Sequence, residues 1–298
     1  MGKPFLERLF WMPNYFTIAI RKKKKPEDHV LNTHKFVSDL DLTSSQRYWK
    51  ADPMLIEDGE NTYLFYEACH DGKGLLEVVQ IKDDLSTSEP AIILEKEYHL
   101  SYPYVFKYHD EWYMIPESCA CNKVQLYKAL NFPLQWEYTD TILEGYFVDT
   151  TVVVNDDKIL LETFGANQQC EAVNPYAYYL SIENGQTSLE ALDWFETDEY
   201  RTRGAGQIWR FGNQLYRPAQ LNQPHSYGDG VIFKKLLLDY LTLEEADLFE
   251  LLPQNVTFKR YKFDGLHTYT STTRYEAIDV RCSFFDILKP LKKIMGKI

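Results

Sequence analysis

Polar side chains recur at equivalent places along the chain, where segments that read as β-strands begin or end. They are Asp52, Tyr102, Asp149 and Gln207 in one set of strands, and Glu67, Glu117, Glu162 and Gln220 in a second set. Carboxylates gathered around one pocket suit glycosidic chemistry, in which one acid protonates the leaving oxygen and another carboxylate activates water or an acceptor hydroxyl. The alternative, that such residues cap strands, is open for each one. It is less favoured for the whole set, because unpaired buried carboxylates are costly.

An internal repeat must position these residues. Glu67 and Glu117 lie 50 residues apart, Glu162 follows after 45 and Gln220 after a further 58. The copies span residues 51–68, 101–118, 148–163 and 206–220, with a weaker fifth at 258–272. In each copy a strand, a turn rich in Asp, Asn or Gly and a second strand follow one another, and further strands come after them. Four strands in a unit of about 40–50 residues are typical of a β-propeller blade.

We therefore expect an all-β fold, a five-bladed β-propeller with a short basic C-terminal helix. The propeller is expected over residues 1–283, with the strand at 15–21 closing the last blade and removing an exposed sheet edge. No helical stretch separates the strands, which argues against βαβ units. Because first strands line the channel of a propeller, polar residues far apart in sequence are expected to converge there.

The composition narrows the function. The chain has 298 residues, a net charge of −12 and 15% aromatic residues. Aromatic residues favour strands and line sugar-binding clefts. An acidic chain is a poor partner for nucleic acid. Five scattered cysteines without metal-ligand spacing suit a reducing compartment, and no signal peptide or membrane span is recognised. We expect a cytoplasmic protein without a metal or cofactor.

Longer motifs carry a resemblance to a known family. The segments ADPMLI, SYPYVFKYHDEWYMIPES, VDTTVVV, RGAGQIWRFGNQLYRPAQ and GLHTYT are similar to the N-terminal propeller domain of plant glucosamine inositolphosphorylceramide transferases and its stand-alone bacterial relatives, over about residues 49–270. That domain in turn resembles the five-bladed propellers of inverting arabinanases and xylosidases. The plant proteins carry their glycosyltransferase domain in a separate part of the chain, so the resemblance alone does not imply transferase activity.

The resemblance to those hydrolases implies roles for single residues. Asp52 fits the general base, Asp149 the residue that tunes pKa values, and His267 the histidine near the channel axis. The acid of the fourth blade is missing, because Gln207 stands there and an amide cannot donate a proton as a carboxylic acid does. Glu117, from the second blade, is the candidate acid. A simple hydrolase is therefore disfavoured.

Two arginines suggest another use of the channel. Arg203 and Arg217, with Gln220, suit the phosphate or carboxylate of a nucleotide sugar, a polyprenyl-phosphate sugar or an acidic sugar. Salt bridges within an acidic protein are the competing and favoured explanation. Tyr102 and its neighbour Tyr104 are candidates for stacking on sugar rings.

Three functions follow as hypotheses. The first is an enzyme that forms or remodels a glycosidic linkage during the biosynthesis of a surface polysaccharide or glycolipid. The second is a non-catalytic glycan-binding module that assists a partner transferase, and the third is an inverting glycoside hydrolase. The tail at 284–298 is a basic amphipathic segment. It suits contact with the inner face of the membrane, or docking on the propeller.

Overall fold

The computed structural model describes residues 15–45, 47–155, 158–169, 172–194, 200–223, 226–238, 242–258 and 262–283. In this part of the chain nearly all regular structure is β, as predicted. The exceptions are one helical turn, α2 (Val30–Thr33), and the 3-10 turns η1 (Cys119–Cys121) and η2 (Pro253–Asn255). None of the described helices has the length and apolarity needed to span a membrane. The predicted C-terminal helix at 284–298 lies outside the described residues.

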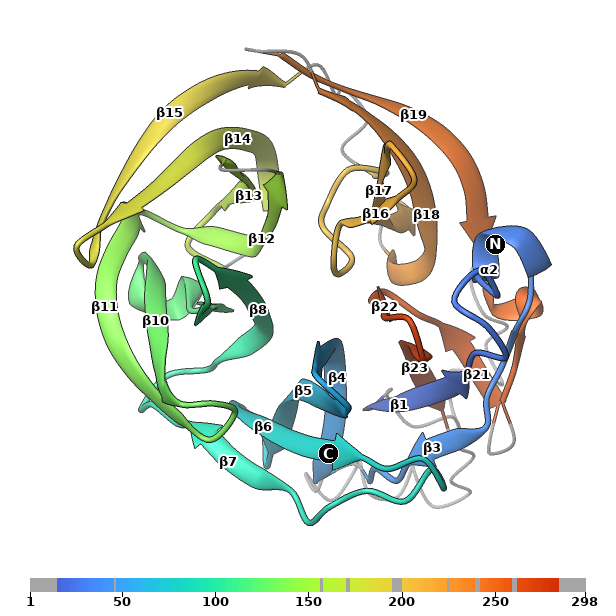
Figure 1. Cartoon of the computed structure of the whole chain (residues 1–298). Helices are drawn as coiled ribbons and strands as arrows, with labels where there is room; N and C mark the ends of the chain where they lie inside the picture. The colour runs from blue at the N-terminus through green and yellow to red at the C-terminus, as the bar shows by residue number, and fades with distance from the viewer. Residues whose placement is uncertain are drawn as a thin grey trace, which may run out of the picture.

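The strands form propeller-like sheets arranged around a central axis (Figure 1). The first sheet has the order β4 (Tyr48–Asp58), β5 (Asn61–His70), β6 (Lys73–Ile81) and β7 (Ala91–Leu94). The second has the order β8 (Ser101–Tyr108), β9 (Glu111–Glu117), β10 (Lys123–Asn131) and β11 (Gln135–Glu144). In each sheet the earliest strand lies nearest the axis and the last lies outermost.

The third sheet consists of two such groups joined at their outer edges. One group is β12 (Phe147–Asn155), β13 (Lys158–Ala166), β14 (Ala172–Glu183) and β15 (Gln186–Trp194). The other is β16 (Trp209–Phe211), β17 (Gln214–Gln223), β18 (Ser226–Leu238) and β19 (Thr242–Leu251). A short parallel pairing of β15 with β19 connects them.

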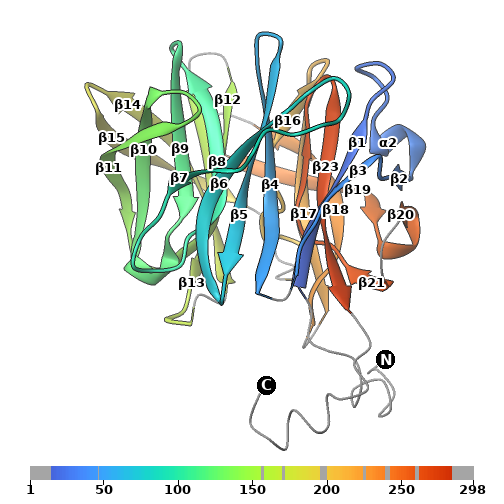
Figure 2. The same cartoon turned by 90° about the horizontal axis from the view of Figure 1, so that it is seen from below.

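The remaining sheet joins the two ends of the described chain. Its order is β21 (Lys262–Gly265), β23 (Tyr275–Ser283), β1 (Tyr15–Lys22) and β3 (Leu40–Leu42), and β22 (Tyr269–Ser271) also pairs with β23. β1 and β23 are antiparallel along their whole length, from Tyr15 opposite Cys282 to Lys22 opposite Tyr275. Figure 2 shows these strands side by side. A small parallel pair, β2 (Phe36–Val37) with β20 (Val256–Thr257), lies beside them.

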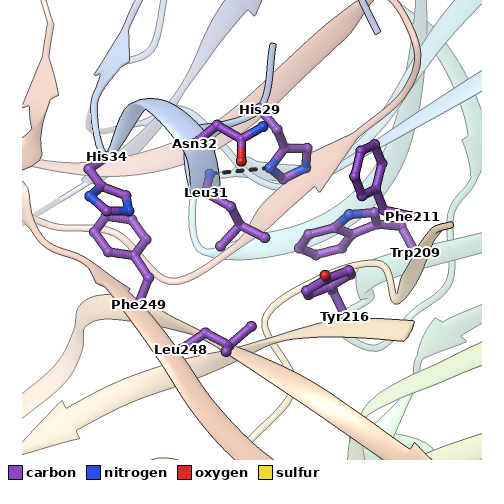
Figure 3. A pocket seen from close by; sticks show the side chains of 9 residues that line it. All are labelled: His29, Leu31, Asn32, His34, Trp209, Phe211, Tyr216, Leu248 and Phe249. Atoms are coloured by element: carbon purple, nitrogen blue, oxygen red, sulfur yellow. Dashed lines mark hydrogen bonds between the residues drawn. The ribbon is translucent and has the colours of Figure 1, made fainter. Parts of the chain in front are cut away.

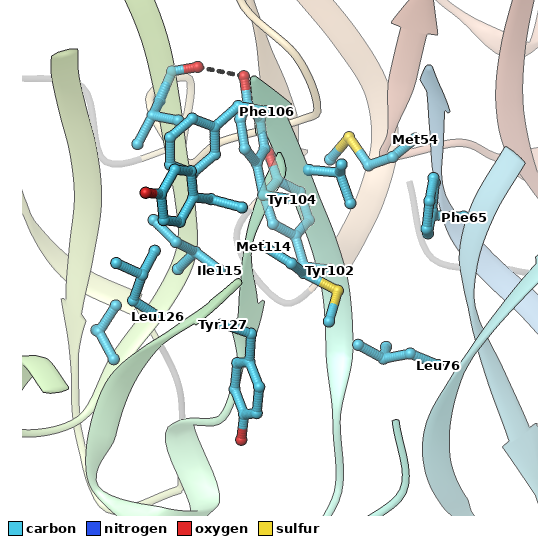
Figure 4. Packing of buried hydrophobic residues seen from close by; sticks show 14 of the residues in the cluster. Met54, Phe65, Leu76, Tyr102, Tyr104, Phe106, Met114, Ile115, Leu126 and Tyr127 are labelled. Atoms are coloured by element: carbon cyan, nitrogen blue, oxygen red, sulfur yellow. Dashed lines mark hydrogen bonds between the residues drawn. The ribbon is translucent and has the colours of Figure 1, made fainter. Parts of the chain in front are cut away.

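The core lies between the sheets. The largest cluster of buried apolar side chains spans the first three strand groups and includes Met54, Phe65, Leu76, Met114 and Leu126, all fully buried (Figure 4). Because each sheet is covered on both faces by its neighbours, inner strands such as β5 are buried at nearly every position instead of alternating with solvent. This packing holds the axial strands, and the polar residues on them, in fixed positions.

Candidate functional site

A repeated backbone irregularity directs the polar residues of the first strands. Asp52, Tyr102 and Asp149 have φ angles of 50°, 45° and 50°, a left-handed conformation that is uncommon outside glycine. Each lies at a break in the pairing of β4 with β5, β8 with β9 and β12 with β13. Such bulges re-aim side chains, and strained backbone of this kind is concentrated at functional sites.

In the fourth copy the residue with a positive φ is Gly206, one position before Gln207, and it is a glycine for a steric reason. Gly206 has a φ of 121°, and a Cβ atom there would lie 1.9 Å from the carbonyl oxygen of Tyr269. The backbone at Gly206 therefore approaches β22 more closely than any side chain would permit.

Asp52 lies in a dense hydrogen-bond network. Its Oδ1 accepts a hydrogen bond from the Thr268 hydroxyl at 2.9 Å and lies 3.2 Å from His267 Nε2, and its Oδ2 accepts from the Tyr102 backbone N–H at 3.2 Å. Burial raises the pKa of Asp52, but the hydrogen bonds and the charge of His267 outweigh it and leave this pKa below its ordinary value. Asp52 is therefore ionised at neutral pH.

His267 bridges two carboxylates. Its Nδ1 lies 2.9 Å from Asp279 Oδ2, on the side opposite Asp52. Burial lowers the pKa of His267, but the charges and hydrogen bonds of Asp279 and Asp52 dominate and raise it to about 10. Asp279 also accepts hydrogen bonds from the backbone N–H groups of Asp52, His267 and Thr268. This array ties β23 to the neighbouring strand β4.

Asp52, His267 and Asp279 are the one group in the described ranges whose geometry resembles a metal site. Their candidate ligand atoms lie within 4.8 Å of one another. A neutral imidazole binds a metal through a nitrogen lone pair. Both nitrogens of His267 face carboxylates, and its raised pKa keeps both protonated. In this arrangement the imidazole and the two carboxylates form an ion-paired array.

Glu117 and Asp149 form a second part of the polar cluster to which Asp52, His267 and Asp279 belong. The Asp149 backbone N–H donates to Glu117 Oε2 at 3.1 Å, and the Asp149 carboxylate is paired with the Arg203 guanidinium. Burial raises the pKa of Glu117 to about 8, with the charge of Asp149 adding to the effect. Burial also raises the pKa of Asp149, and Arg203 partly offsets it. Glu117 therefore holds a proton at neutral pH, while Asp52 does not.

Glu67 is paired with a histidine that the sequence did not single out. His99 Nε2 lies 3.0 Å from Glu67 Oε1, and His99 Nδ1 accepts a hydrogen bond from the Gly74 backbone N–H at 3.0 Å. Burial raises the pKa of Glu67 to about 7, although the hydrogen bond from His99 opposes this. The side chain of His99 is 42% exposed, so this pair connects the buried cluster with solvent.

Arg217 and Glu162 do not belong to an accessible site. Arg217 is 1% exposed and is paired with Glu162 and, at 3.0 Å, with Glu245 Oε1. Lys234 completes the network, with its Nζ 3.0 Å from the other oxygen of Glu245. The expected anion-binding role of Arg217 is therefore corrected to the competing explanation, an internal salt bridge. Glu162, fully buried beside it, likewise offers no surface to a substrate.

The expectation that Tyr102 stacks on a sugar is also corrected. Its ring is fully buried, its hydroxyl lies 2.9 Å from Thr151 Oγ1, and the Gly206 N–H donates to that hydroxyl at 2.7 Å. Tyr102 shares the strained backbone of Asp52, but its long apolar ring packs into the core. Its hydroxyl binds Thr151 on the neighbouring strand β12 and the backbone at Gly206.

The two glutamines line the same region. Gln220 is 1% exposed, and its Nε2 donates to the Gly204 carbonyl at 2.9 Å and lies 3.4 Å from Asp149 Oδ2. Gln207 is partly exposed and accepts a hydrogen bond from the Thr270 hydroxyl. Gln220 thus supports Asp149, while Gln207 remains accessible.

Sequence reasoning missed three residues of the cluster: His99, Tyr227 and Asp279. None occupies a repeated position of the hairpins. His99 stands two residues before the motif that begins at Ser101, which is a weak signal at most. Tyr227 lies in β18, the third strand of its group, and Asp279 lies in β23. The repeat predicts no polar residue at either position.

A separate cavity of about 260 Å³ lies away from this cluster, between α2 and strands β16, β17 and β19 (Figure 3). The residues that line it are His29, Leu31, Asn32, His34, Trp209, Phe211, Tyr216, Leu248 and Phe249. His29 and Tyr216 both stack on Trp209, with ring centroids 4.9 Å and 5.7 Å away. These rings pack on one another, and none of them lies at a position of the repeated polar residues.

The raised carboxyl pKa values predict a pH-dependent stability. Between its ordinary pKa of 4.5 and its folded pKa of about 8, Glu117 keeps a proton that the unfolded chain releases. Because the folded state then binds more protons, the free energy of unfolding must fall as pH rises through this window. We expect a lower Tm at about pH 8.5 than at about pH 5.5, and a shallower decline in Glu117→Gln, which has no proton to lose. An equally steep decline in the variant would contradict the assignment.

Comparison with known proteins agrees with this architecture. Residues 30–280 match the family described as glucosamine inositolphosphorylceramide transferase 1, N-terminal. The protein of that name from Arabidopsis thaliana is 41% identical over 213 residues, which are 65% of this chain and 26% of the relative. The one from Oryza sativa subsp. indica is 30% identical over 243 residues, 78% of this chain and 31% of the relative. The chain thus spans less than a third of the length of these relatives.

Solved structures show the same fold at low sequence identity. The GH43_1 enzyme from Xanthomonas citri complexed with xylotriose has a TM-score of 0.56 and 11% identity, covering 81% of this chain and 88% of its own. The α-L-arabinofuranosidase PaAbf62A from Podospora anserina, in complex with cellotriose, has a TM-score of 0.54 and 12% identity, covering 89% and 97%. The family match extends over most of the sequence, and so this chain belongs to the family of the N-terminal region of glucosamine inositolphosphorylceramide transferase 1.

Proposed function

We propose that this chain is a five-bladed, carbohydrate-active propeller that forms or remodels a glycosidic linkage in the biosynthesis of a surface polysaccharide or glycolipid. One observation carries the proposal: two carboxyl groups of one cluster have pKa values displaced in opposite directions. Glu117 keeps its proton near neutral pH and Asp52 is ionised. Pairs displaced in this way are typical of an acid and a base. The transferase name of the relatives supports the same reaction class.

In this proposal Glu117 is the general acid. Its Oε2 accepts the hydrogen bond from the Asp149 backbone N–H, so we assign the proton to Oε1, which delivers it to the leaving oxygen. Asp149 tunes this acid, because its negative charge discourages ionisation of Glu117. Arg203 in turn limits that charge. Asp52 accepts the proton of the attacking hydroxyl once one of its three hydrogen bonds opens.

A second function has a specific observation in its favour. Both oxygens of Asp52 already accept hydrogen bonds, and its side chain is only 9% exposed. A carboxylate so fully engaged is a weak base. This favours a glycan-binding module that presents a sugar to a partner transferase. Hydrolysis is the least supported, because Gln207 stands where the acid of similar hydrolases is expected.

We further propose that the sugar can be linked to a nucleotide or lipid phosphate. Arg203, whose side chain is 16% exposed, is the arginine of the cluster that such a phosphate could reach, whereas Arg217 is enclosed. The same proposal includes a cytoplasmic location with peripheral membrane contact through residues 284–298.

The test combines binding with turnover. Nucleotide sugars, sugar phosphates and neutral oligosaccharides are screened by thermal shift, since a ligand at 100 times its Kd adds about 2.7 kcal/mol to stability. Each ligand that binds is then incubated with the wild type and with Asp52→Asn. Turnover that disappears in Asp52→Asn supports the enzyme. Binding without turnover supports the module, and no binding by any sugar overturns both.

A further inference from the structure

One aromatic residue of the cluster is presented to solvent. Tyr227 is 40% exposed, in contrast to the enclosed Tyr102. Its ring centroid lies 5.1 Å from that of His267, and the Arg203 guanidinium lies 5.2 Å from it. Tyr227 therefore rests on two charged members of the site while part of its ring remains accessible.

The backbone around Tyr227 is fixed from several sides. Its carbonyl accepts a hydrogen bond from the Arg281 guanidinium. The following residue, Gly228, donates its N–H to Asn222 Oδ1 at 2.8 Å and accepts from the Leu266 N–H at 2.9 Å. The Tyr227 side chain is therefore partly exposed on a backbone that is held in place. A ring held in advance binds a ligand at a lower entropic cost.

The charges around the ring define the ligand class. Three cations contact Tyr227, and each already has a carboxylate partner. Arg203 is paired with Asp149, and His267 lies between Asp52 and Asp279. Arg281, which binds the Tyr227 carbonyl, is paired with Asp264 and Asp229. Among the described residues, the cations at Tyr227 are thus offset by carboxylates and do not favour an anionic sugar ring, and a donor phosphate would have to compete with Asp149 for Arg203. An aromatic ring with hydrogen-bonding groups beside it suits a ligand with an apolar face and polar edges, which describes an uncharged sugar.

Within the proposed function, on which this inference rests, we propose that Tyr227 determines specificity by holding the apolar face of an uncharged pyranose ring against the cluster. The ring is either free or the sugar of a phosphate-linked donor. Tyr227 takes the stacking role expected of Tyr102. Its hydroxyl is not required for stacking, so the ring alone should account for the affinity.

The experiment measures the Kd of methyl glycosides of neutral hexoses and pentoses by NMR titration of the whole protein. Tyr227→Leu should raise the Kd of the glycoside that binds by about 2- to 10-fold, the loss of one aromatic contact. Tyr227→Phe should stay within about twofold of wild type. The matched control is Tyr176→Leu, at a tyrosine of β14 that is also 40% exposed but lies outside the cluster.

The outcomes separate the two proposals. An unchanged Kd in Tyr227→Leu overturns the role of Tyr227 and leaves the proposed function standing. Tighter binding of glucuronic acid or glucosamine than of every neutral glycoside overturns the ligand class. Failure of all sugars to bind the wild type overturns the proposed function together with this inference. Equal Tm values for Tyr227→Leu and Tyr176→Leu check that the variants are folded.

Discussion

Replacement of Arg217 by alanine is expected to lower the free energy of unfolding by about 3–5 kcal/mol. The guanidinium is 1% exposed and lies between Glu162 and Glu245, both equally enclosed. Without it, Glu162 and Glu245 remain buried, and Lys234 contacts Glu245 alone of the two. A buried charge without its partner is costly. Urea denaturation followed by circular dichroism measures the change.

Arg201 provides the matched control. It also pairs with two acids, Asp247 and Glu250, but its side chain is 27% exposed. Water and salt screen such a pair, so Arg201→Ala should lower the free energy of unfolding by less than about 1 kcal/mol. If Arg217→Ala remained as stable as Arg201→Ala yet no longer bound a sugar phosphate, the internal salt-bridge explanation would fail and the anion-binding role would return.

The sequence predicted the propeller-like sheets because their signals are local. Strand patterns and Asp-, Asn- or Gly-containing turns depend on neighbouring residues, and their repetition at about 50 residues made them visible. Glu67 and Glu117, which the repeat aligns, lie on the second strands of their sheets, three residues before the end of β5 and at the end of β9. The family resemblance, carried by the same segments, is confirmed by the match over residues 30–280.

The site was harder to predict, because a repeat fixes backbone positions but not the direction or partners of side chains. Asp52 and Tyr102 occupy equivalent positions of the repeat and share a strained φ angle. The Asp52 carboxylate nevertheless joins the polar cluster, whereas the Tyr102 ring packs in the core. Arg217 on β17 reaches Glu245 on β19 only because both strands pair with β18. Asp279 binds Asp52 across 227 residues. No spacing in one sequence reveals such pairs.

Replacement of Glu117 by glutamine should reduce turnover by about 10²- to 10⁴-fold, the contribution of a positioned proton donor. The donor sugar is the one found by the binding screen, and its Kd should change little, because the amide keeps the size and the hydrogen bond from Asp149. The wild type should lose activity as pH rises through about 8, where Glu117 releases its proton. That alkaline decline should be missing from the residual activity of the variant.

A control on the same strand separates this effect from a general loss of charge. Glu111 begins β9, is exposed, and pairs with Lys128 at the far end of the strand from Glu117. Glu111→Gln should retain wild-type turnover and pH profile. If Glu117→Gln kept both as well, the acid would have to be another group, and Glu67, whose pKa is also raised and which contacts the exposed His99, would be the next to test. The shape of the pH profile, more than the size of the loss, therefore decides whether this carboxyl group donates the proton.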